Sequence, residues 1–385
     1  MSAIATVLLE MGFTVEGSDL KESSYVRRLR DGGAVVGIGH RAENVGESLL
    51  LIRSSAVRGD NPEILEALRR GIPVVSRAAM LAAIMATGRG IAVAGTHGKT
   101  TTSSLIACML KGCGADPTYL VGGELSEQGG NAHFGTGDFV VAEADESDGS
   151  FLRLRPELAV ITNIDWDHLD FFDSPEHTER IFRDFLELLP VDGGVAVVSG
   201  DDERARAVAE DYMRSGGRVV FYGRGESNGY RVVSAETGAR GGTFEVVCPE
   251  GEMSKVDVLL PGMHNVYNAL AALAAGRELG FEMAELASGI STCKGVRRRY
   301  DTVGSRGGIT VVDDYAHHPS EIKAVLEVAG AAGAERVVAV FQPHRYTRTR
   351  MLPGISPRVS RRPTSSWSPM CTVRARSPSQ ALPEG

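Results

Sequence analysis

The chain has 385 residues, which is long enough for two or three domains rather than one. Its 43% hydrophobic and 23% charged residues are typical of a soluble globular protein, and its formal net charge of −8 argues against a nucleic-acid-binding surface. The sequence has no uncharged apolar stretch of about 18 residues for a membrane helix, and its five cysteines contain no CxxC pair, which argues against a disulfide framework and a zinc site and favours a reducing cytoplasm.

The first segment of the chain, residues 1–88, alternates short helical and extended patterns. Asn61 followed by Pro62 is typical of a helix N-cap and first turn. This alternation predicts a Rossmann-like domain with a parallel sheet, whose first strand and glycine-rich turn would lie upstream of Met1. We expect strands at 13–19, 34–39, 48–57 and 72–76, and helices at 2–11, 22–31, 61–70 and 78–87.

The second segment, residues 89–293, starts a new α/β unit. A tightly packed helix is expected over 264–280, because small and apolar residues recur there with a helical period. The stretches 216–223 and 242–249 indicate an antiparallel edge. Further strands are predicted at 90–95, 138–145, 158–164 and 194–200.

The third segment, residues 294–350, predicts part of another Rossmann-like unit, with a strand and turn at 308–319, a helix at 320–332 and a strand at 336–344. The last stretch, 351–385, holds six prolines, seven serines, five arginines and one acidic residue, and no periodic pattern continues there. Such a composition cannot bury a core and predicts a disordered tail that resembles an out-of-frame translation.

A phosphate-binding loop is predicted where a strand turns into a helix that begins with Lys99. Backbone N–H groups of the turn would cradle an anion at the helix N-terminus, Lys99 would contact the β- and γ-phosphates, and the Thr100 hydroxyl would bind Mg²⁺. Val93 stands where the common G-x-x-x-x-G-K-[ST] pattern has glycine, so a helix start with a solvated lysine is the alternative. The residues assigned to the nucleotide here are Gly95, Thr96, His97, Gly98, Lys99, Thr100 and Thr101.

Two further loops place charged side chains at strand ends. EADESDGSF brings Glu143, Asp145, Glu146 and Asp148 within six positions, and such carboxylates repel one another unless a cation or basic group is near. TNIDWDHLD adds His168 in a similar place. A solvated acidic loop and a structural histidine are the alternatives. Because ligands of parallel α/β sheets bind where strands end, we expect the three loops to meet in one crevice, with His168 binding metal or facing phosphate.

Six motifs, taken in chain order, resemble those of the Mur ligase family: AGTHGKTTT, EADESDGSF, TNIDWDHLD, PGMHNVYNALAA, DDYAHHPSEI and FQPHRYTRT. A phosphate loop with valine at position 93 is normal for that family. The resemblance covers about residues 1–350 and implies a three-domain α/β architecture. Its parts would be a Rossmann-like UDP-sugar domain at 1–88, a P-loop ATPase domain at 89–293 and an incomplete Rossmann-like domain at 294–350, with 351–385 as the tail.

The resemblance implies an ATP- and Mg²⁺-dependent cytoplasmic ligase of peptidoglycan-precursor synthesis, and hence a role in cell-wall biogenesis, cell shape and division. ATP would phosphorylate the carboxylate of UDP-N-acetylmuramate, and the amino group of L-alanine would attack the acyl phosphate. The alternatives are a ligase that attaches a preformed tripeptide to the same nucleotide sugar, and a non-catalytic ATP-binding remnant. Folylpolyglutamate synthase, a further alternative, shares the ATPase core but lacks the UDP-sugar domain that residues 1–88 are expected to form. The oligomeric state stays open.

The same resemblance implies roles for individual residues. Thr100 matches a ligand of a first Mg²⁺, and Glu143 and His168 match ligands of a second. An arginine fork would hold the amino-acid carboxylate and the acyl phosphate, with an exposed basic loop as the alternative. His317 and His318 would belong to the face that closes on the nucleotide, with a capped turn before Pro319 as the alternative. The matched catalytic positions are Lys99, Glu143, His168, Arg345 and Arg348, with His344 beside the arginines, and the matched positions around the nucleotide are His264, Asn265, Asn268, Arg298 and Asp314.

Overall fold

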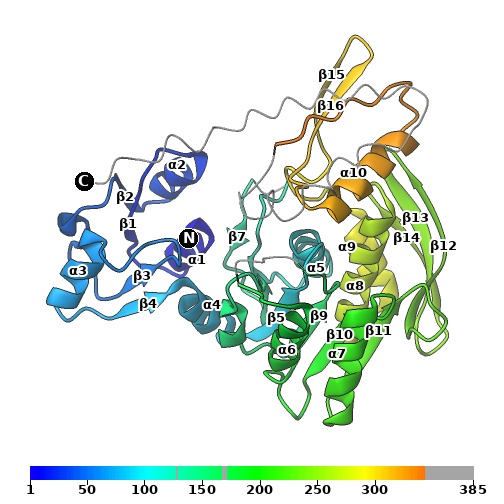
Figure 1. Cartoon of the computed structure of the whole chain (residues 1–385), viewed down its shortest axis with the longest axis horizontal. Helices are drawn as coiled ribbons and strands as arrows, with labels where there is room; N and C mark the ends of the chain where they lie inside the picture. Colours follow the sequence, from blue (N-terminus) through cyan, green and yellow to red (C-terminus); the bar gives the residue numbers. More distant parts are fainter. Residues whose placement is uncertain (127–128, 167–170, 343–385) are drawn as a thin grey trace.

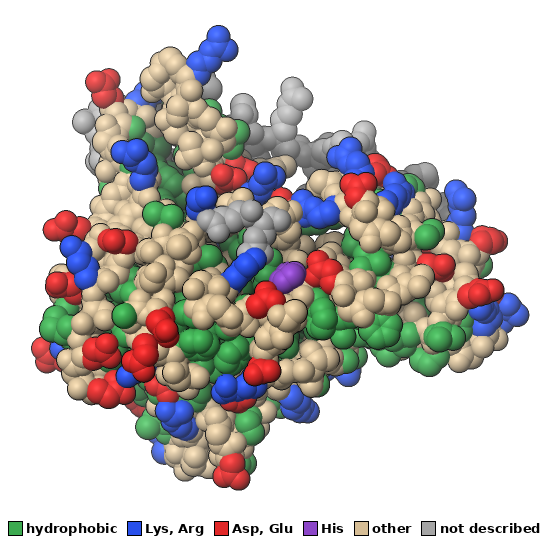
Figure 2. Space-filling model, turned by 180° about the vertical axis from the view of Figure 1, so that it is seen from behind, with side chains coloured by type: hydrophobic (Ala, Val, Ile, Leu, Met, Phe, Trp, Pro, Cys, Tyr) green, Lys and Arg blue, Asp and Glu red, His purple; other side chains and the backbone are tan. Residues whose placement is uncertain are grey.

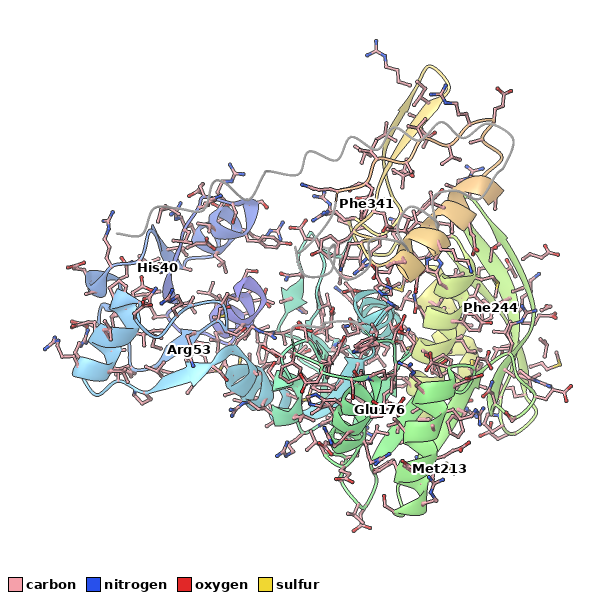
Figure 3. The ribbon with its side chains drawn as sticks, in the orientation of Figure 1. His40, Arg53, Glu176, Met213, Phe244 and Phe341 are labelled. Carbon is pink, nitrogen blue, oxygen red and sulfur yellow. A yellow bond between two sulfur atoms is a disulfide. The ribbon has the colours of Figure 1, made fainter. Side chains whose placement is uncertain are left out.

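The computed structural model describes residues 1–126, 129–166 and 171–342 (Figure 1). A central unit built around one large sheet carries a smaller N-terminal unit at one side and a third unit, from residue 294 onward, above the other end. Figure 3 shows Arg53 in the first unit and Phe244 on the far strand layer, which marks the span between the two sides of the molecule.

The central sheet has ten strands in the order β14-β13-β12-β11-β10-β9-β5-β8-β6-β7. The pairs from β12 across to β6 are parallel, whereas β7, β13 and β14 pair antiparallel with their neighbours. The strands are β5 (Arg89–Ala94), β6 (Thr118–Leu120), β7 (Ala132–His133), β8 (Phe139–Glu143), β9 (Leu158–Ile161), β10 (Val195–Ser199), β11 (Val219–Gly223), β12 (Tyr230–Gly238), β13 (Gly241–Val247) and β14 (Met253–Val258).

The antiparallel edge predicted from the sequence is partly right. Residues 242–249 fall on β13, which is antiparallel, but residues 216–223 fall on β11, which pairs parallel with both β10 and β12. The prediction for β11 is therefore wrong, because the switch of direction comes one strand later, at the tight turn between β12 and β13.

Helices cover both faces of the central sheet. Strand β5 shows why, because its apolar side chains point to both faces. Its Ile91 and Val93 pack in a cluster with α5, α8 and α9, whereas Ala92 and Ala94 pack on the opposite face with α4, α6 and α7. Strands buried on both faces read as continuous apolar runs, which is the pattern of a parallel α/β sheet. These helices are α4 (Arg77–Met85), α5 (Lys99–Gly112), α6 (Pro175–Leu186), α7 (Glu203–Arg214), α8 (Met263–Glu278) and α9 (Met283–Ser291).

The first unit has the alternation that the sequence predicts. The side chain of Asn61 accepts a hydrogen bond from the Glu63 N–H at 2.9 Å, so that the helix begins at Pro62 as expected. Its strands form two separate parallel pairs, β1–β2 and β3–β4, within the described residues. The elements are α1 (Ser2–Glu10), β1 (Glu16–Asp19), α2 (Ser24–Asp31), β2 (Val35–Ile38), β3 (Leu51–Arg53), α3 (Pro62–Arg69) and β4 (Val74–Ser76).

The third unit consists of an antiparallel hairpin, β15 (Asp301–Arg306) and β16 (Ile309–Asp313), followed by α10 (Pro319–Ala331). β16 and α10 confirm the predicted strand and helix. The strand predicted at 336–344 is wrong over its described part, 336–342, which has no regular structure. Val338 and Val340 are 54% and 89% exposed there, so none of the strands that the structure describes covers this apolar stretch.

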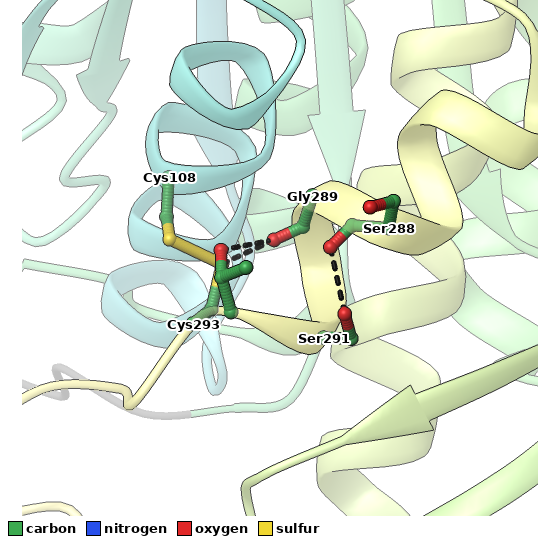
Figure 4. The surroundings of a disulfide bond; sticks show 6 residues. Cys108, Ser288, Gly289, Ser291 and Cys293 are labelled. Atoms are coloured by element: carbon green, nitrogen blue, oxygen red, sulfur yellow. Dashed lines mark hydrogen bonds between the residues drawn. A yellow bond between two sulfur atoms is a disulfide. The ribbon is translucent and has the colours of Figure 1, made fainter.

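A disulfide joins Cys108 on α5 to Cys293 just after α9, with the two Cα atoms 6.0 Å apart (Figure 4). The expectation from cysteine spacing is wrong for this pair. A Cβ added to Gly112 would lie 2.8 Å from the Cα of Gly289, so the two helices touch backbone to backbone and bring the cysteines together. A sequence separation of 185 residues gives no sign of this contact.

None of the helices in the described ranges has the length and apolar character that a membrane crossing requires. On the face drawn in Figure 2, the described basic and acidic side chains are interspersed rather than gathered by sign.

Replacing Gly289 by alanine should destabilise the protein, because the added Cβ would lie 2.7 Å from the carbonyl oxygen of Met109. Overpacking of this kind costs about 1–3 kcal/mol, and the thermal unfolding midpoint of the full chain measures it. Gly330→Ala is the matched control, since it lies in α10 with no atom within 4 Å of the new Cβ. Equal midpoints for the two variants would contradict the close contact between α5 and α9.

Candidate active site

The predicted strand, turn and helix of the phosphate loop are present at the carboxyl edge of the parallel strands. β5 ends at Ala94 and α5 begins at Lys99. The turn depends on Gly95 and Gly98, which have φ values of +128° and +84°, a region that residues with a Cβ rarely adopt. A Cβ on Gly98 would also lie 2.7 Å from Oδ1 of Asn268 on α8. The loop therefore needs glycine at both positions.

The Lys99 side chain folds back over this loop. Its Nζ donates to the carbonyl oxygens of Gly95 at 2.6 Å and Thr96 at 3.1 Å, and it lies 2.9 Å from Oε2 of Glu146. The Lys99 and Glu146 side chains are only 11% and 1% exposed. Burial opposes the charge on Lys99, but the carboxylates of Glu146 and Glu143 outweigh it and raise the lysine pKa. Burial raises the pKa of Glu146 to about 7, against the opposing charge of Lys99.

The acidic loop after β8 gives each carboxylate a different partner. Glu143 Oε2 accepts hydrogen bonds from the Thr100 hydroxyl and the Gly122 N–H, both at 2.9 Å. Asp145 and Asp148 accept from backbone N–H groups two residues further on, both at 3.0 Å, and so shape the turn. The structure thus brings Thr100, Lys99, Glu143 and Glu146 together, as the two predicted motifs required. From the sequence, Glu146 is one of four candidate acidic residues in this loop. Its pairing with Lys99 is not predicted.

The loop after β9 holds the phosphate loop from the side. Asn163 accepts a hydrogen bond from the His97 N–H and donates one to the His97 carbonyl, both at 2.9 Å, and the Thr162 hydroxyl donates to the same carbonyl at 2.6 Å. Sequence reasoning used this motif only for His168, which lies outside the described residues. The signal it missed is the Thr-Asn pair that follows an apolar strand directly.

The start of α8 supports the loop from below. Asn268 Oδ1 accepts from the Thr102 hydroxyl at 3.2 Å, and its amide donates to Asn265 Oδ1 at 3.1 Å. The Asn265 amide in turn donates to the Pro261 carbonyl at 2.8 Å. The two asparagines are 6% and 8% exposed and tie α8 to α5. Their contact with an adenine stays a prediction, as does that of His264, whose pKa burial lowers.

The predicted residues of the third unit lie in its turn regions. Asp314 accepts hydrogen bonds from the N–H groups of Tyr300 at 2.7 Å and Ala316 at 2.6 Å, and burial raises its pKa. The Arg298 guanidinium lies over the Tyr315 ring, 4.8 Å from its centroid. Their contact with a nucleotide stays a prediction.

The predicted pair His317 and His318 lies directly before the first turn of α10. His318 Nδ1 accepts the Ser320 N–H at 3.4 Å, so the capped turn before Pro319 is present. His344, Arg345 and Arg348 lie outside the described residues.

A strand–loop–helix with a buried lysine, a threonine hydroxyl and a facing carboxylate at the carboxyl edge of a parallel sheet defines a phosphate-loop nucleotide-binding protein. Family models narrow this class. Residues 1–89 match "Mur ligase family, catalytic domain", residues 93–276 match "Mur ligase middle domain", and residues 298–359 match "Mur ligase, glutamate ligase domain". The chain belongs to the Mur ligase family. The third match passes Arg350, near which the sequence resemblance was expected to end.

Individual relatives agree with this assignment. The chain is 46% identical over 352 residues to the UDP-N-acetylmuramate--L-alanine ligase of Anaeromyxobacter dehalogenans, covering 91% of this chain and 76% of the relative. It is 50% identical over 361 residues to the enzyme of the same name from Rubrobacter xylanophilus, covering 91% and 77%. Among solved structures, the UDP-N-acetylmuramate-alanine ligase of Thermotoga maritima superposes with a TM-score of 0.79 at 30% identity, covering 91% and 80%.

Replacing Gly98 by alanine should weaken Mg-ATP binding at least about tenfold, because the new Cβ would strain a positive φ and collide with Asn268. Isothermal titration calorimetry measures the affinity. Gly114→Ala is the control, since Gly114 also has a positive φ, of +78°, but no atom lies within 4 Å of its added Cβ. Unchanged ATP affinity in Gly98→Ala would show that this turn does not bind the nucleotide.

Proposed function

We propose that the chain is an ATP-dependent ligase that joins L-alanine to the carboxylate of UDP-N-acetylmuramate, a step in peptidoglycan-precursor synthesis. The observation that carries the proposal is identity of 46–50% over 91% of the chain to enzymes of that name. The buried Lys99 and the Thr100–Glu143 pair supply the phosphate chemistry such a reaction needs. Its use of ATP and a nucleotide sugar supports a cytoplasmic setting.

The comparisons favour L-alanine over a preformed tripeptide as acceptor. The murein peptide ligase of Psychrobacter arcticus superposes with a TM-score of 0.73 at 25% identity, below the 0.79 and 30% of the Thermotoga maritima alanine ligase. In the proposed division of labour, residues 1–88 bind the UDP-sugar, 89–293 bind ATP and 294–350 bind the amino acid. Arg345 and Arg348 would hold the carboxylate of the amino acid.

The proposed role of Lys99 follows from where negative charge develops during phosphoryl transfer. Transfer of the γ-phosphoryl group to a carboxylate gathers negative charge on the transferring oxygens, and a fixed cation in a buried site stabilises that charge strongly. Lys99 is such a cation, and its Nζ is held at the loop by Gly95, Thr96 and Glu146. We propose that Lys99 contacts the γ-phosphate while the loop N–H groups hold the phosphate chain.

Thr100 and Glu143, next to the phosphate loop, suit Mg²⁺. Thr100 Oγ1 and Glu143 Oε2 are hard oxygen donors 2.9 Å apart. Two adjacent ligands of an octahedral Mg²⁺, with bonds of about 2.1 Å, lie about 3 Å apart, so the pair fits this ion. The resemblance assigns Thr100 to a first Mg²⁺ and Glu143 with His168 to a second, but the short spacing of Thr100 and Glu143 leads us to propose that these two residues share one Mg²⁺, with His168 as a further ligand. The ion would neutralise charge on the phosphoryl group and its acceptor oxygen.

Phosphate release by the purified chain should require UDP-N-acetylmuramate and L-alanine together, since neither alone completes the amide. A coupled assay for inorganic phosphate with single-substrate omissions measures this, and mass spectrometry identifies the product. A higher kcat/KM with an L-alanine-initiated tripeptide than with L-alanine would favour the peptide-transferring alternative.

Lys99→Ala should lower kcat by at least about a thousandfold, because it removes the cation at the transferring phosphoryl group. Lys111→Ala is the control, since Lys111 lies in the last turn of the same helix, far from the loop. Thermal unfolding of both variants checks that the fold persists. Near-normal turnover by Lys99→Ala would remove the central role of this residue.

Thr100→Ala should raise the Mg²⁺ concentration needed for half-maximal activity, because it removes one of the two oxygen donors. Thr100→Ser keeps the hydroxyl and should behave much like the unmodified chain. Activity is titrated against Mg²⁺ at saturating ATP. If Thr100→Ala and Thr100→Ser respond to Mg²⁺ alike, the hydroxyl is not a metal ligand.

A further inference from the structure

The third unit contacts the phosphate loop at the partly buried imidazole of His97. His97, at the middle of the loop, places Nδ1 3.3 Å from Oε1 of Glu321 on α10. Its Nε2 lies 3.7 Å from Oδ2 of Asp165, and its ring lies 4.7 Å, centroid to centroid, from that of His318. The His97 side chain of the phosphate loop thus contacts residues in the first turn of α10.

Glu321 divides its two oxygens between two tasks. Oε2 accepts the N–H groups of His317 at 3.0 Å and His318 at 3.2 Å, which completes the capping box of α10. Oε1 faces the His97 ring. The Glu321 side chain is 15% exposed, and Arg299 lies 3.9 Å from Oε1. The helix cap would need only one of these oxygens, so the second is available to bind the loop.

The charges at this contact are complementary. Burial opposes a charge on His97, but the neighbouring carboxylates of Asp165 and Glu321 raise its pKa to about 9. Burial likewise opposes the charge on Glu321, and the His97 contact lowers the pKa of this carboxyl well below its usual range. The His97 and Glu321 side chains are only 18% and 15% exposed, so that an imidazolium–carboxylate contact between them makes a stronger link than a surface ion pair.

We propose that Glu321 is a positioning residue, which acts through His97 to fix α10, and with it the third unit, against the phosphate loop. Asn163 and Thr162 hydrogen-bond the His97 backbone. A shift of the His97 ring would therefore also shift the loop, two residues before Lys99. A unit that brings the amino acid must stand at a defined distance from the phosphoryl group, since small misplacements cost orders of magnitude in rate. The inference rests on the proposed function and adds to it the residue that sets this distance.

The same side chains could instead hold a metal ion, because the ligand atoms of His97, Asp165 and His318 all lie within 4.8 Å of one another. Two observations favour the ion pair. His97 lies between the carboxylates of Glu321 and Asp165, which raise the pKa of its ring to about 9, so that a metal would have to displace a proton. His318 uses Nδ1 to accept the Ser320 N–H, so that in the neutral ring Nε2 carries the proton.

The test uses Glu321→Gln in the full chain, because glutamine can still accept the cap hydrogen bonds but carries no charge for His97. Glu327→Gln on the same helix is the matched control, since the Glu327 side chain is 60% exposed and lies 3.9 Å from the Lys323 ammonium rather than at the His97 ring. Hydrogen exchange of the α10 amides, compared with those of α5, measures docking without any need for activity. We expect faster exchange in α10 for Glu321→Gln, no change in α5, and no change in either helix for Glu327→Gln.

Kinetics then separate positioning from binding. Glu321→Gln should lower kcat about tenfold or more and leave the KM for ATP within about twofold. His97→Asn should lower kcat likewise, and the double variant should have a kcat no lower than that of His97→Asn, because both changes remove one link. The KM for ATP is compared only for Glu321→Gln, because His97 is also assigned to the nucleotide-binding loop. Additive losses, or an unchanged α10 exchange, would overturn the proposal. So would a rise in thermal midpoint on adding Zn²⁺ that His97→Asn abolishes, because that result identifies a metal site.

The two proposals fail in different ways. If the unmodified chain shows no amide formation, the proposed function fails while the exchange experiment still reports on docking. If the unmodified chain forms the amide and Glu321→Gln matches Glu327→Gln in both exchange and kcat, the positioning role alone is wrong.

Discussion

The buried ion pair of Lys99 and Glu146 is the interaction on which the rest of the site depends. A lysine with so little exposure cannot keep its charge unless carboxylate and carbonyl oxygens surround it closely. Those oxygens come from the end of β5 and from the loop after β8, and the two strands are direct neighbours in the sheet. The order of the strands in the sheet therefore decides whether Lys99 can carry its charge at this position. The glycines of the loop allow the Lys99 side chain to fold back onto the backbone.

Much of the central unit could be predicted from its sequence, because its signals are local. Apolar runs such as 90–95 mark strands buried on both faces, and the glycine-lysine-threonine turn marks where α5 begins. The pairing of Thr100 with Glu143 also follows from local signals, once both residues are placed at neighbouring strand ends. What the sequence could not supply were partners defined only in space: the Cys108–Cys293 bond, the parallel pairing of β11 and the contact of His97 with Glu321.

The third unit shows the limit of pattern reasoning most clearly. The apolar stretch around Val338 and Val340 has strand propensity, yet a strand needs a neighbour to pair with and a surface to cover, and the described residues offer it neither. The histidines before α10 show the opposite case, since a motif expected to face the nucleotide also caps the helix. One short segment can thus start α10 and bring His318 against the phosphate loop.

We infer that the phosphate loop binds the ATP whose γ-phosphoryl group is transferred to the carboxylate of UDP-N-acetylmuramate. UDP-N-acetylmuramate labelled with ¹⁸O in its carboxylate, incubated with ATP, Mg²⁺, L-alanine and the full chain, tests this claim most directly. If the carboxylate attacks the γ-phosphoryl group and L-alanine then displaces phosphate, one ¹⁸O atom must appear in the inorganic phosphate for each amide formed. Amide formation with unlabelled phosphate, or with AMP and pyrophosphate as products, would contradict phosphoryl transfer from ATP to the carboxylate.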